Sequence, residues 1–395
     1  MIQPKMTRRS WFTSAGLLTS AGMAAAGAAA PAAEKYPRNL TKEEVDRWMT
    51  ELSNWGKWGK DDQAGTINLI TPAKRKAAAG LVKEGVSVSA SLDADLPKEG
   101  STGVALGGGG GPRGGAPGQA GQGAPPAAGA PPAGANPPGG GRGPDGRGGR
   151  GGPFVERPTW SLASRPPGPD PRPLAAYVTD TISVSYHGNN TTHLDSLAHL
   201  YFKGQIYNGF PQTSYTDRGA GKNDVMPFKN GIFTRGMLFD IPKLKGVPYL
   251  GDDEPIYPED LEAWEKKAGF RLESGDAMLV RTGRWLRVKE KGPLNLNVAT
   301  PGLYASCCKW MRERGVAILG SDVVQDVRPS RVEGVNQPIH QIGIQAMGLP
   351  LIDNCILEEL GEAAGKRRRW TFLLTINPLR VPGATGGPVN PIATF

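Results

Sequence analysis

The amino-acid sequence predicts a mixed α/β fold in a single domain, and two observations support this prediction. Apolar runs of strand length, such as residues 232–241 and 277–282, are interspersed with stretches of helical spacing, such as residues 258–268. Outside the Gly-rich residues 107–153, the sequence contains neither a G-x-G-x-x-G loop nor a P-loop, so no candidate strand or helix carries the motifs of the nucleotide-binding α/β folds. We therefore expect a mixed α/β class without a nucleotide-binding signature.

Residues 1–33 have the pattern of a twin-arginine signal peptide. Arg8 and Arg9 precede a weakly apolar run rich in Ala and Gly, and residues 28–33 offer A-x-A-like cleavage sites. The run is too short and its side chains are too small for a good membrane span, although an uncleaved N-terminal anchor is the alternative. Twin-arginine signals belong to bacterial export, so we expect a periplasmic or secreted protein that folds before it crosses the membrane.

The first elements of the mature chain are predicted to be two helices and a strand. Thr41 and Glu44 have the spacing of a capping box, and apolar residues follow them at helical intervals. Thr71 as N-cap, with a proline at the first helical position, predicts a second helix over residues 72–82. Alternating apolar residues then predict a strand over residues 86–92.

Residues 107–153 interrupt the domain, which otherwise spans residues 34–395. The segment consists almost entirely of Gly, Pro and Ala and contains no bulky apolar residue. It therefore cannot bury enough apolar surface to offset the entropy cost of ordering it. Because loop length adds closure entropy only slowly, we expect a disordered insertion in one domain rather than a linker between two.

The chain after this insertion predicts alternating strands and helices. Apolar runs predict the strands, and helical spacing bounded by Gly or Pro predicts the helices. The expected strands are residues 176–186, 232–241, 277–282, 316–319, 349–353 and 370–376, and the expected helices are residues 258–268, 302–314, 338–347 and 358–364. The tail, residues 378–395, is rich in Gly and Pro but keeps several apolar side chains, so we expect it to pack.

The charge and the cysteines exclude two classes of protein. The net charge is +9, but the signal peptide and the insertion carry most of it. The small remainder gives no reason to expect nucleic-acid binding. Cys307, Cys308 and Cys355 are too few for a disulfide framework. We expect three buried, small apolar residues, with one bridge to Cys355 as the alternative.

Residues 187–199, HGNNTTHLDSLAH, concentrate residue types that bind metals. They contain three of the four histidines of the chain, His187, His193 and His199, together with Asp195. If the middle of the segment is extended, His193 and Asp195 point the same way, because side chains alternate along a strand. A helix beginning after Asp195 would bring His199 back over that carboxylate, four residues on.

Imidazole and carboxylate ligands suit a zinc or manganese ion, and the lack of a thiolate argues against a structural zinc site. Such an ion lowers the pKa of a bound water to about 7 and polarises a carbonyl group. A nearby imidazole that does not bind the ion can take or give a proton. A lone H-x-D pair on a strand is usually structural, but the third histidine four residues later favours a metal or catalytic site.

The stretch THLDSLAH resembles the H-x-D-x-x-x-H half of the signature of the cyclase family of metal-dependent hydrolases, which includes bacterial kynurenine formamidase and isatin hydrolase. Other stretches also look like the larger members of this family, among them WGKDDQAGTINLITPAKRKAAAGLVKEGVSVS, SGDAMLVRTG and PIHQIGIQAMGLPLIDN. The resemblance covers residues 40–395 apart from the insertion. It implies an α/β fold of the swivelling-domain type, with a mixed, barrel-like sheet and flanking helices, usually assembled as oligomers.

The resemblance also implies roles for individual residues. His193 and Asp195 fall on metal ligands, and His199 falls on the histidine that acts as the catalytic acid/base. His340 falls on a histidine that helps to hold a second metal in the two-zinc members, and Asp353 falls near a glutamate that does the same.

The chain departs from the family pattern at two positions. Shorter members carry a histidine four residues before His193, where this chain has Asn189. Either His187 takes over that ligand role or Asn189 contributes an oxygen. Asp353 reaches one methylene less far than the glutamate it replaces. We therefore expect one firmly held metal, with a second one possible.

The function predicted on this basis is hydrolysis of a C–N bond of an amide, formamide or cyclic amide by metal-activated water, with Zn²⁺ or Mn²⁺ as cofactor. One alternative is a cyclase, dehydratase or lactonase that acts on a carbonyl metabolite with the same metal site. Another is a non-catalytic metal- or ligand-binding protein. The expected partners are a small-molecule substrate and further copies of the chain in a homo-oligomer. We expect no nucleic acid and no stable membrane association after signal removal.

Overall fold

A mixed sheet of nine strands is the centre of the part of the chain described by the computed structural model, residues 35–93, 159–164 and 178–395. Its strands, in spatial order, are β1 (Ser87–Ser89), β15 (Ile392–Thr394), β13 (Thr371–Ile376), β7 (Ile232–Asp240), β9 (Ala277–Arg281), β11 (Ile318–Ser321), β12 (Leu351–Asp353), β4 (His193–Asp195) and β14 (Gly386–Pro388). The predicted signal peptide and the predicted insertion lie outside the described residues.

The middle of the sheet is parallel and its two edges are antiparallel. β7, β9, β11 and β12 run parallel to one another, whereas β13, β15 and β1 on one side and β4 and β14 on the other pair antiparallel. Strands of a parallel sheet are covered on both faces and read as continuous apolar runs. This explains why residues 277–281 and 318–321 are buried almost throughout.

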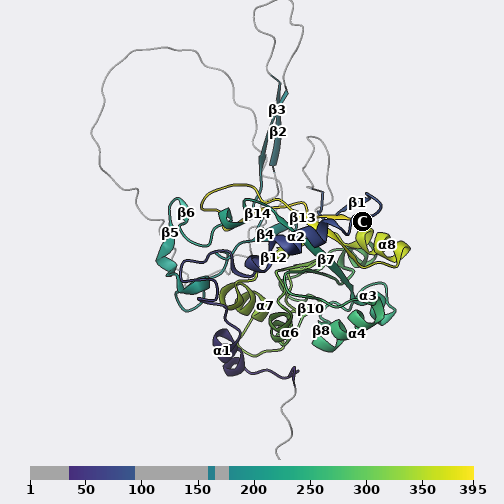
Figure 1. The fold of residues 1–395 in the computed structure, drawn as a ribbon, viewed down its shortest axis with the longest axis horizontal. Coiled ribbons are helices and arrows are strands. Elements are labelled where there is room, and N and C mark those ends of the chain that lie inside the picture. Colours follow the sequence, from purple (N-terminus) through teal and green to yellow (C-terminus); the bar gives the residue numbers. More distant parts are fainter. Residues whose placement is uncertain (1–34, 94–158, 165–177) are drawn as a thin grey trace, which may run out of the picture. The chain divides into compact units, whose positions relative to one another are not determined.

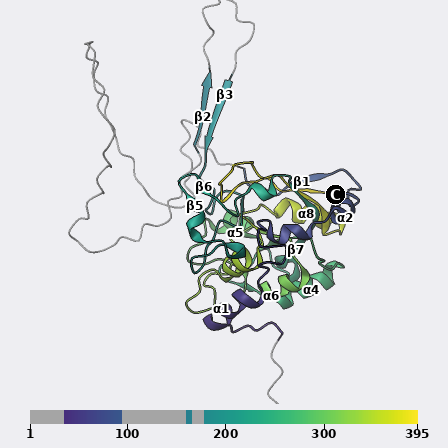
Figure 2. The ribbon, with the colours of Figure 1, turned by 60° about the vertical axis from the view of Figure 1, so that its left-hand side comes forward.

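The sheet is curled into a half-barrel, and helices flank it (Figure 1). In both views α4 and α6 lie on the opposite side of β7 from α2 and α8 (Figure 2). The helices are α1 (Lys42–Glu51), α2 (Pro72–Ala79), α3 (Ile241–Lys245), α4 (Pro258–Ala268), α5 (Arg284–Lys291), α6 (Cys307–Arg314), α7 (Pro338–His340), which continues as a π-helix (Gln341–Met347), and α8 (Glu358–Arg367).

The smaller elements complete the description. Three separate two-stranded sheets pair β2 (Thr159–Ser164) with β3 (Val178–Ser183), β5 (Tyr215–Thr216) with β6 (Gly219–Ala220), and β8 (Pro255–Ile256) with β10 (Gly302–Leu303). Short 3₁₀ turns cover Gly65–Leu69, Tyr207–Gly209, Gln212–Ser214 and Met226–Phe228. Within the described residues, no helix is both long and apolar enough to cross a membrane.

Several element predictions are confirmed by the structure. The Thr41 hydroxyl accepts from the Glu44 amide, and the Glu44 carboxylate accepts from the Thr41 amide, so the predicted capping box begins α1. The helix over residues 258–268 has the predicted bounds. The Gly/Pro-rich tail packs as predicted, because β14 and β15 both join the main sheet.

Two predicted helices are longer than the observed ones. The helix expected over residues 302–314 begins only at Cys307, because Gly302 and Leu303 form β10. The amide of Leu303 donates to the Gln325 carbonyl, a pairing across 22 residues that helical spacing does not reveal. The helix expected over residues 72–82 ends at Ala79, since Gly80 is its C-cap. All three cysteines are buried and free, so the alternative of a bridge is wrong.

Candidate metal centre

β4 carries the predicted H-x-D pair between two antiparallel neighbours. His193 lies opposite Asp353 of β12, and Asp195 lies opposite Gly386 of β14. A side chain at Gly386 would collide with the Leu194 carbonyl oxygen, so only glycine lets β14 approach this closely. The pairing therefore fixes the strand and brings Asp353 beside the histidine segment.

The Asp195 carboxylate lies in the middle of all four histidines of the chain. Its Oδ1 is 2.9 Å from His187 Nδ1, 3.4 Å from His193 Nε2 and 3.8 Å from His199 Nδ1. Its Oδ2 is 3.9 Å from His340 Nε2. The fold thus brings His340, to which the resemblance gives a place at a second metal, to the same carboxylate as the three clustered histidines.

The cluster contains two groups of side chains with the geometry to hold a cation, and Asp195 belongs to both. His187, Asp195 and His199 form one, and His193, Asp195 and Asp353 form the other; in each, the ligand atoms lie within 4.8 Å of one another. His340 Nε2 is 3.6 Å from Asp353 Oδ2, so it adjoins the second group. The structure thus brings together every predicted site residue.

Asn189 is the alternative to His187 at the first ligand position, and its backbone carbonyl is bound to Arg284. Its carbonyl oxygen accepts a hydrogen bond of 2.7 Å from Arg284. His187 is the residue of this loop whose ring nitrogen lies against Asp195. The predicted extension of the strand back to His187 is not present, because residues 187–191 form bends rather than strand.

His199 reaches Asp195 by a route that differs from the predicted one. A helix was expected after Asp195, but residues 197–198 form a turn in which the His199 amide donates to the Ser196 carbonyl. The turn brings the His199 ring against that of His187, with the centroids 4.1 Å apart and the rings stacked. The four-residue spacing is thus sufficient for the contact without a continuing helix.

Three residues that sequence analysis missed contact members of the cluster and orient them. Asp326 accepts from His340 Nδ1 at 2.6 Å, and the Gln325 amide donates to Asp353 Oδ1 at 3.0 Å. The Thr385 hydroxyl lies 2.9 Å from His187 Nε2. Partners of this kind fix ring orientation and ligand basicity in metal sites. Nothing in their local sequence signals the role, because each contact joins distant parts of the chain.

The ionisation of the cluster follows from burial and from its mixture of charges. Burial acts to raise the pKa of the Asp195 carboxyl, but His199, His193 and His187 outweigh it and hold that pKa well below its usual range. Burial lowers the pKa of His199 to about 4, against the opposing effect of Asp195. Burial also acts to lower the pKa of His340, but Asp326 and Asp353 outweigh it and raise that pKa to about 10.

The donor set fits a divalent cation. Both Asp195 oxygens are buried, and neither has a well-aligned hydrogen-bond partner among the described residues, although His187 Nδ1 is 2.9 Å away. Leaving buried carboxylate oxygens unsatisfied is costly unless a charge binds them. Nitrogen and carboxylate oxygen donors without a thiolate suit zinc or manganese. A cation bound between these side chains would satisfy both oxygens.

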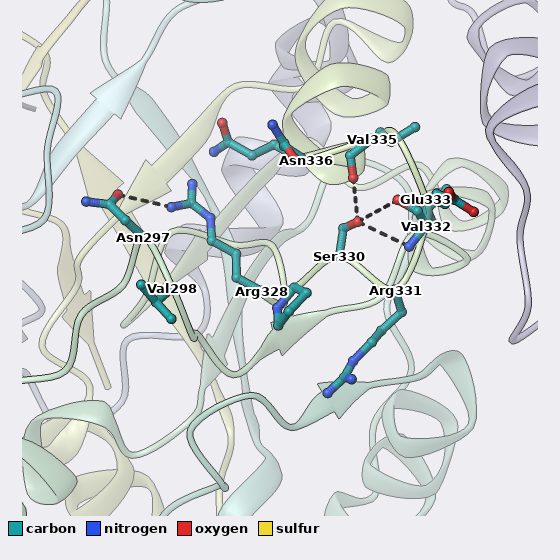
Figure 3. Close-up of a pocket in the computed structure, with 11 residues that line it drawn as sticks. Asn297, Val298, Arg328, Ser330, Arg331, Val332, Glu333, Val335 and Asn336 are labelled. Carbon is teal, nitrogen blue, oxygen red and sulfur yellow. Dashed lines mark hydrogen bonds between the residues drawn. The ribbon is translucent and has the colours of Figure 1, made fainter. Parts of the chain in front are cut away.

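A cavity of about 790 Å³ lies elsewhere, lined by residues 297–298, 328–333 and 335–337. Figure 3 shows the Arg328 side chain directed at Asn297, with which it makes a hydrogen bond of 3.4 Å. The candidate ligands are not among its lining residues. The lining residue nearest to a candidate ligand in the sequence is Gln337, three residues before His340. Its volume therefore says nothing about the space around Asp195.

Comparison with known proteins gives a consistent set of similarities. The family model described as "Putative cyclase" matches residues 152–325, a range that contains the histidine segment but ends before His340 and Asp353. A crystal structure of a novel cyclase is similar over 87% of this chain and 100% of that chain, with 25% sequence identity and a TM-score of 0.66.

Two isatin hydrolase structures are similar over a smaller part of the chain. Isatin hydrolase A from Ralstonia solanacearum has 21% identity and a TM-score of 0.42 over 60% of this chain and 81% of that chain. The enzyme from Labrenzia aggregata, bound to benzyl benzoate, has 19% identity and a TM-score of 0.43 over 62% and 87%. No curated protein sequence matches the chain.

Proposed function

We propose that the chain, which the "Putative cyclase" family model matches over residues 152–325, belongs to the cyclase family and is a metal-dependent hydrolase that cleaves a C–N bond of an amide, formamide or cyclic amide. The observation that supports this most directly is the buried Asp195 carboxylate, which has two unsatisfied oxygens and is shared by two groups of metal-binding geometry. A buried, ionised carboxylate needs hydrogen bonds or a bound charge to offset the loss of water.

The residues of the cluster divide into those that would hold the cation and one that would move a proton. His193, Asp195 and Asp353 would hold it on the buried side, with His340 next to them and His187 on the open side. A divalent cation there supplies an acidified water and a polarised carbonyl. We expect one firmly held Zn²⁺ or Mn²⁺, with a second possible because Asp195 has an oxygen for each group.

His199 is the proposed acid/base. Its side chain is 29% exposed, so it can reach a substrate that approaches from solvent, whereas His193 and His340 are buried. Its Nδ1 is 3.8 Å from Asp195 Oδ1, which is longer than a hydrogen bond and leaves the ring free to act on a substrate. A neutral imidazole there can accept a proton from water and return it to the leaving nitrogen.

The same constellation would serve a lactonase, cyclase or dehydratase, so the test must separate substrates. The protein is stripped with a chelator, reloaded with Zn²⁺ or Mn²⁺, and assayed against matched formamides, lactams and lactones. We expect turnover of a formamide or lactam that depends on the metal. Turnover of lactones alone would replace the proposed reaction, and metal binding without any turnover would indicate a binding protein.

His199→Gln separates the two roles that this side chain could play. As an acid/base, the residue contributes about 10²–10⁴-fold to the rate, while the metal affinity of the variant stays that of the wild type. As a ligand, it would contribute to affinity. Equal rates for variant and wild type would contradict the proton-transfer role, and a lost metal would assign His199 to the ligands.

We also propose export by the twin-arginine route and assembly as a homo-oligomer. Cell fractionation of the protein with and without Arg8→Lys/Arg9→Lys tests the first, since these changes keep the charge and remove the arginine pair. Light scattering of the purified protein tests the second.

A further inference from the structure

Two buried side chains outside the ligand set join the loop before His193 to the end of β12. They are Arg284, the first residue of α5, and Asn354, the residue after Asp353. We propose that Arg284 and Asn354 form a clamp that positions the loop 187–192, and thereby His187 and His193, for metal binding. This inference depends on the metal site of the proposed function.

The contacts of Asn354 reach both ligand-bearing segments. Its side-chain amide donates to the carbonyl oxygens of Gly188 at 2.6 Å and Thr191 at 3.2 Å, and its backbone carbonyl accepts from the Thr192 hydroxyl at 2.6 Å. Through the chain it is bonded directly to Asp353. One residue therefore sets the distance between the histidine loop and the carboxylate ligand on β12.

The backbone of Asn354 is suited to this place. Its φ of 57° lies in the left-handed region, which asparagine tolerates better than most residues with a side chain. The conformation directs the amide back toward the loop instead of continuing β12. Asparagine is thus the residue that combines this backbone with a side chain that both donates and accepts.

Arg284 completes the clamp from the other side. One guanidinium nitrogen, Nη1, donates to Asn354 Oδ1 at 2.6 Å, and the other, Nη2, donates to the Asn189 carbonyl at 2.7 Å. Nη1 also lies 3.3 Å from the Asp322 carbonyl oxygen. Nη1 and Nη2 are held in the rigid plane of the guanidinium, so these two hydrogen bonds fix Asn354 and the loop relative to each other.

Packing alone does not account for Arg284. The residue is 6% exposed, and within the described part of the chain the hydrogen bonds of its guanidinium all go to neutral oxygens. Burial lowers the pKa of Arg284 to about 10, although the nearby carboxylates of Asp322, Asp353 and Glu358 oppose it. A buried charge costs several kcal/mol, and an apolar side chain of similar size would fill the space more favourably. A positioning role explains why the cation is there.

The clamp acts on the orientation of His193. The Thr191 carbonyl, which accepts from Asn354, also lies 2.8 Å from His193 Nδ1. A carbonyl oxygen only accepts, so Nδ1 carries the proton and Nε2 is left free toward Asp195. Residues 187–191 form bends without strand pairing, so the clamp supplies the backbone hydrogen bonds that a sheet would otherwise provide.

The experiment compares Arg284→Lys, Asn354→Gly and the double variant with Arg281→Lys. Glycine permits the left-handed backbone at position 354 and removes only the amide. Arg281 is also largely buried, but it bonds Asp240 and does not contact the loop. Metal affinity is measured by competition with a chromophoric chelator. The absorption spectrum of the Co²⁺ form reports ligand geometry, and hydrogen exchange of residues 188–192 is followed without metal.

We expect each single variant to bind Zn²⁺ about 10- to 100-fold more weakly, as for other partners of metal ligands. The Co²⁺ spectrum should change, and exchange in the loop should accelerate even without metal. The double variant should be little worse than either single one, because both remove the same clamp. Arg281→Lys should keep the wild-type affinity and spectrum, even if it lowers thermal stability.

The outcomes separate the clamp from the proposed function. If the variants lose only thermal stability and keep the wild-type affinity, spectrum and loop exchange, the clamp is contradicted and the metal site stands. If wild-type protein binds no metal, the proposed function fails, and the positioning role fails with it. Asn354→Asp, which keeps the acceptor for Arg284 but loses both donors, checks the result should glycine prevent folding.

Discussion

The two halves of the cluster around Asp195 are built differently. The inner half, His193, His340 and Asp353, is at most 5% exposed and lies on strands and a helix end. The outer half, His187 and His199, is 27% and 29% exposed and lies on a bend and a turn. Each inner ligand has a partner that orients it, namely the Thr191 carbonyl, Asp326 or Gln325.

This difference indicates that the two halves have different roles. Side chains held by sheet register and by a second hydrogen-bonded partner are preorganised, so they bind a cation without further ordering. Side chains on exposed loops cost more entropy to fix, but they remain accessible to a substrate. We therefore expect the inner half to determine metal affinity and the outer half to determine chemistry.

The largest effect is expected from Asp195→Asn, which removes the carboxylate common to both halves. The amide keeps the shape of the side chain but loses the charge that a cation requires, so metal affinity should fall by more than about 100-fold. Elemental analysis after dialysis measures the metal retained. Full occupancy in the variant would show that the two halves do not depend on a shared carboxylate.

A direct comparison of the halves uses His193→Gln and His187→Gln. Loss of the buried His193 removes a preorganised ligand, whereas water can replace His187 on the exposed side. The inner variant should therefore lose about tenfold more affinity than the outer one, within the range seen for perturbed metal sites. Competition with a chelator gives the metal dissociation constant of each variant. A larger loss of affinity in His187→Gln than in His193→Gln would contradict the different roles of the two halves.

Asp326→Asn tests the support behind the inner half. The variant removes the charged acceptor of His340 Nδ1, whose contact is 2.6 Å, while the side chain keeps its size. Metal affinity should fall about tenfold, and the metal-free protein should lose about 1–3 kcal/mol of unfolding free energy, since a buried charged hydrogen bond is weakened. Urea unfolding and chelator competition measure the two effects. Unchanged affinity would mean that His340 needs no orienting partner.

The smallest effect on the metal is expected from Glu358→Gln, a buried carboxyl outside the cluster. Neither of its oxygens has a hydrogen-bond partner in the residues described. Burial, aided by Asp322 and opposed by Arg281, raises the pKa of Glu358 to about 7. Metal affinity should not change, which makes the variant a control for the four variants above.

The pH dependence of stability has a definite sign for this variant. Folded wild type keeps a proton on Glu358 up to about pH 7, whereas the unfolded chain releases it near the ordinary glutamate pKa of 4.5. Wild-type stability therefore falls as the pH rises through this window. Glutamine does not titrate, so the variant should gain about 3 kcal/mol relative to wild type between the two values. Urea unfolding at several pH values measures the gain; a constant difference would contradict the raised pKa.

Local sequence predicted those parts of the fold that depend on neighbours in the chain. The capping box at Thr41 joins residues three apart, and α4 begins at Pro258 and ends before Gly269. The helix expected from residue 302 was wrong at its start, because the pairing of β10 with β8 overrides local spacing. Pairing across the chain is invisible to a pattern of period 3.6.

The sequence by itself determined the metal-binding segment, since His193, Asp195 and His199 lie within seven residues and a strand and turn suffice to converge them. Only the tertiary structure decided what surrounds them. The register of β12 against β4 sets Asp353 opposite His193, and the Arg284–Asn354 pair holds the preceding loop. Such contacts join residues 70 to more than 150 positions apart, and they exist only once the sheet has formed, because no local propensity encodes them.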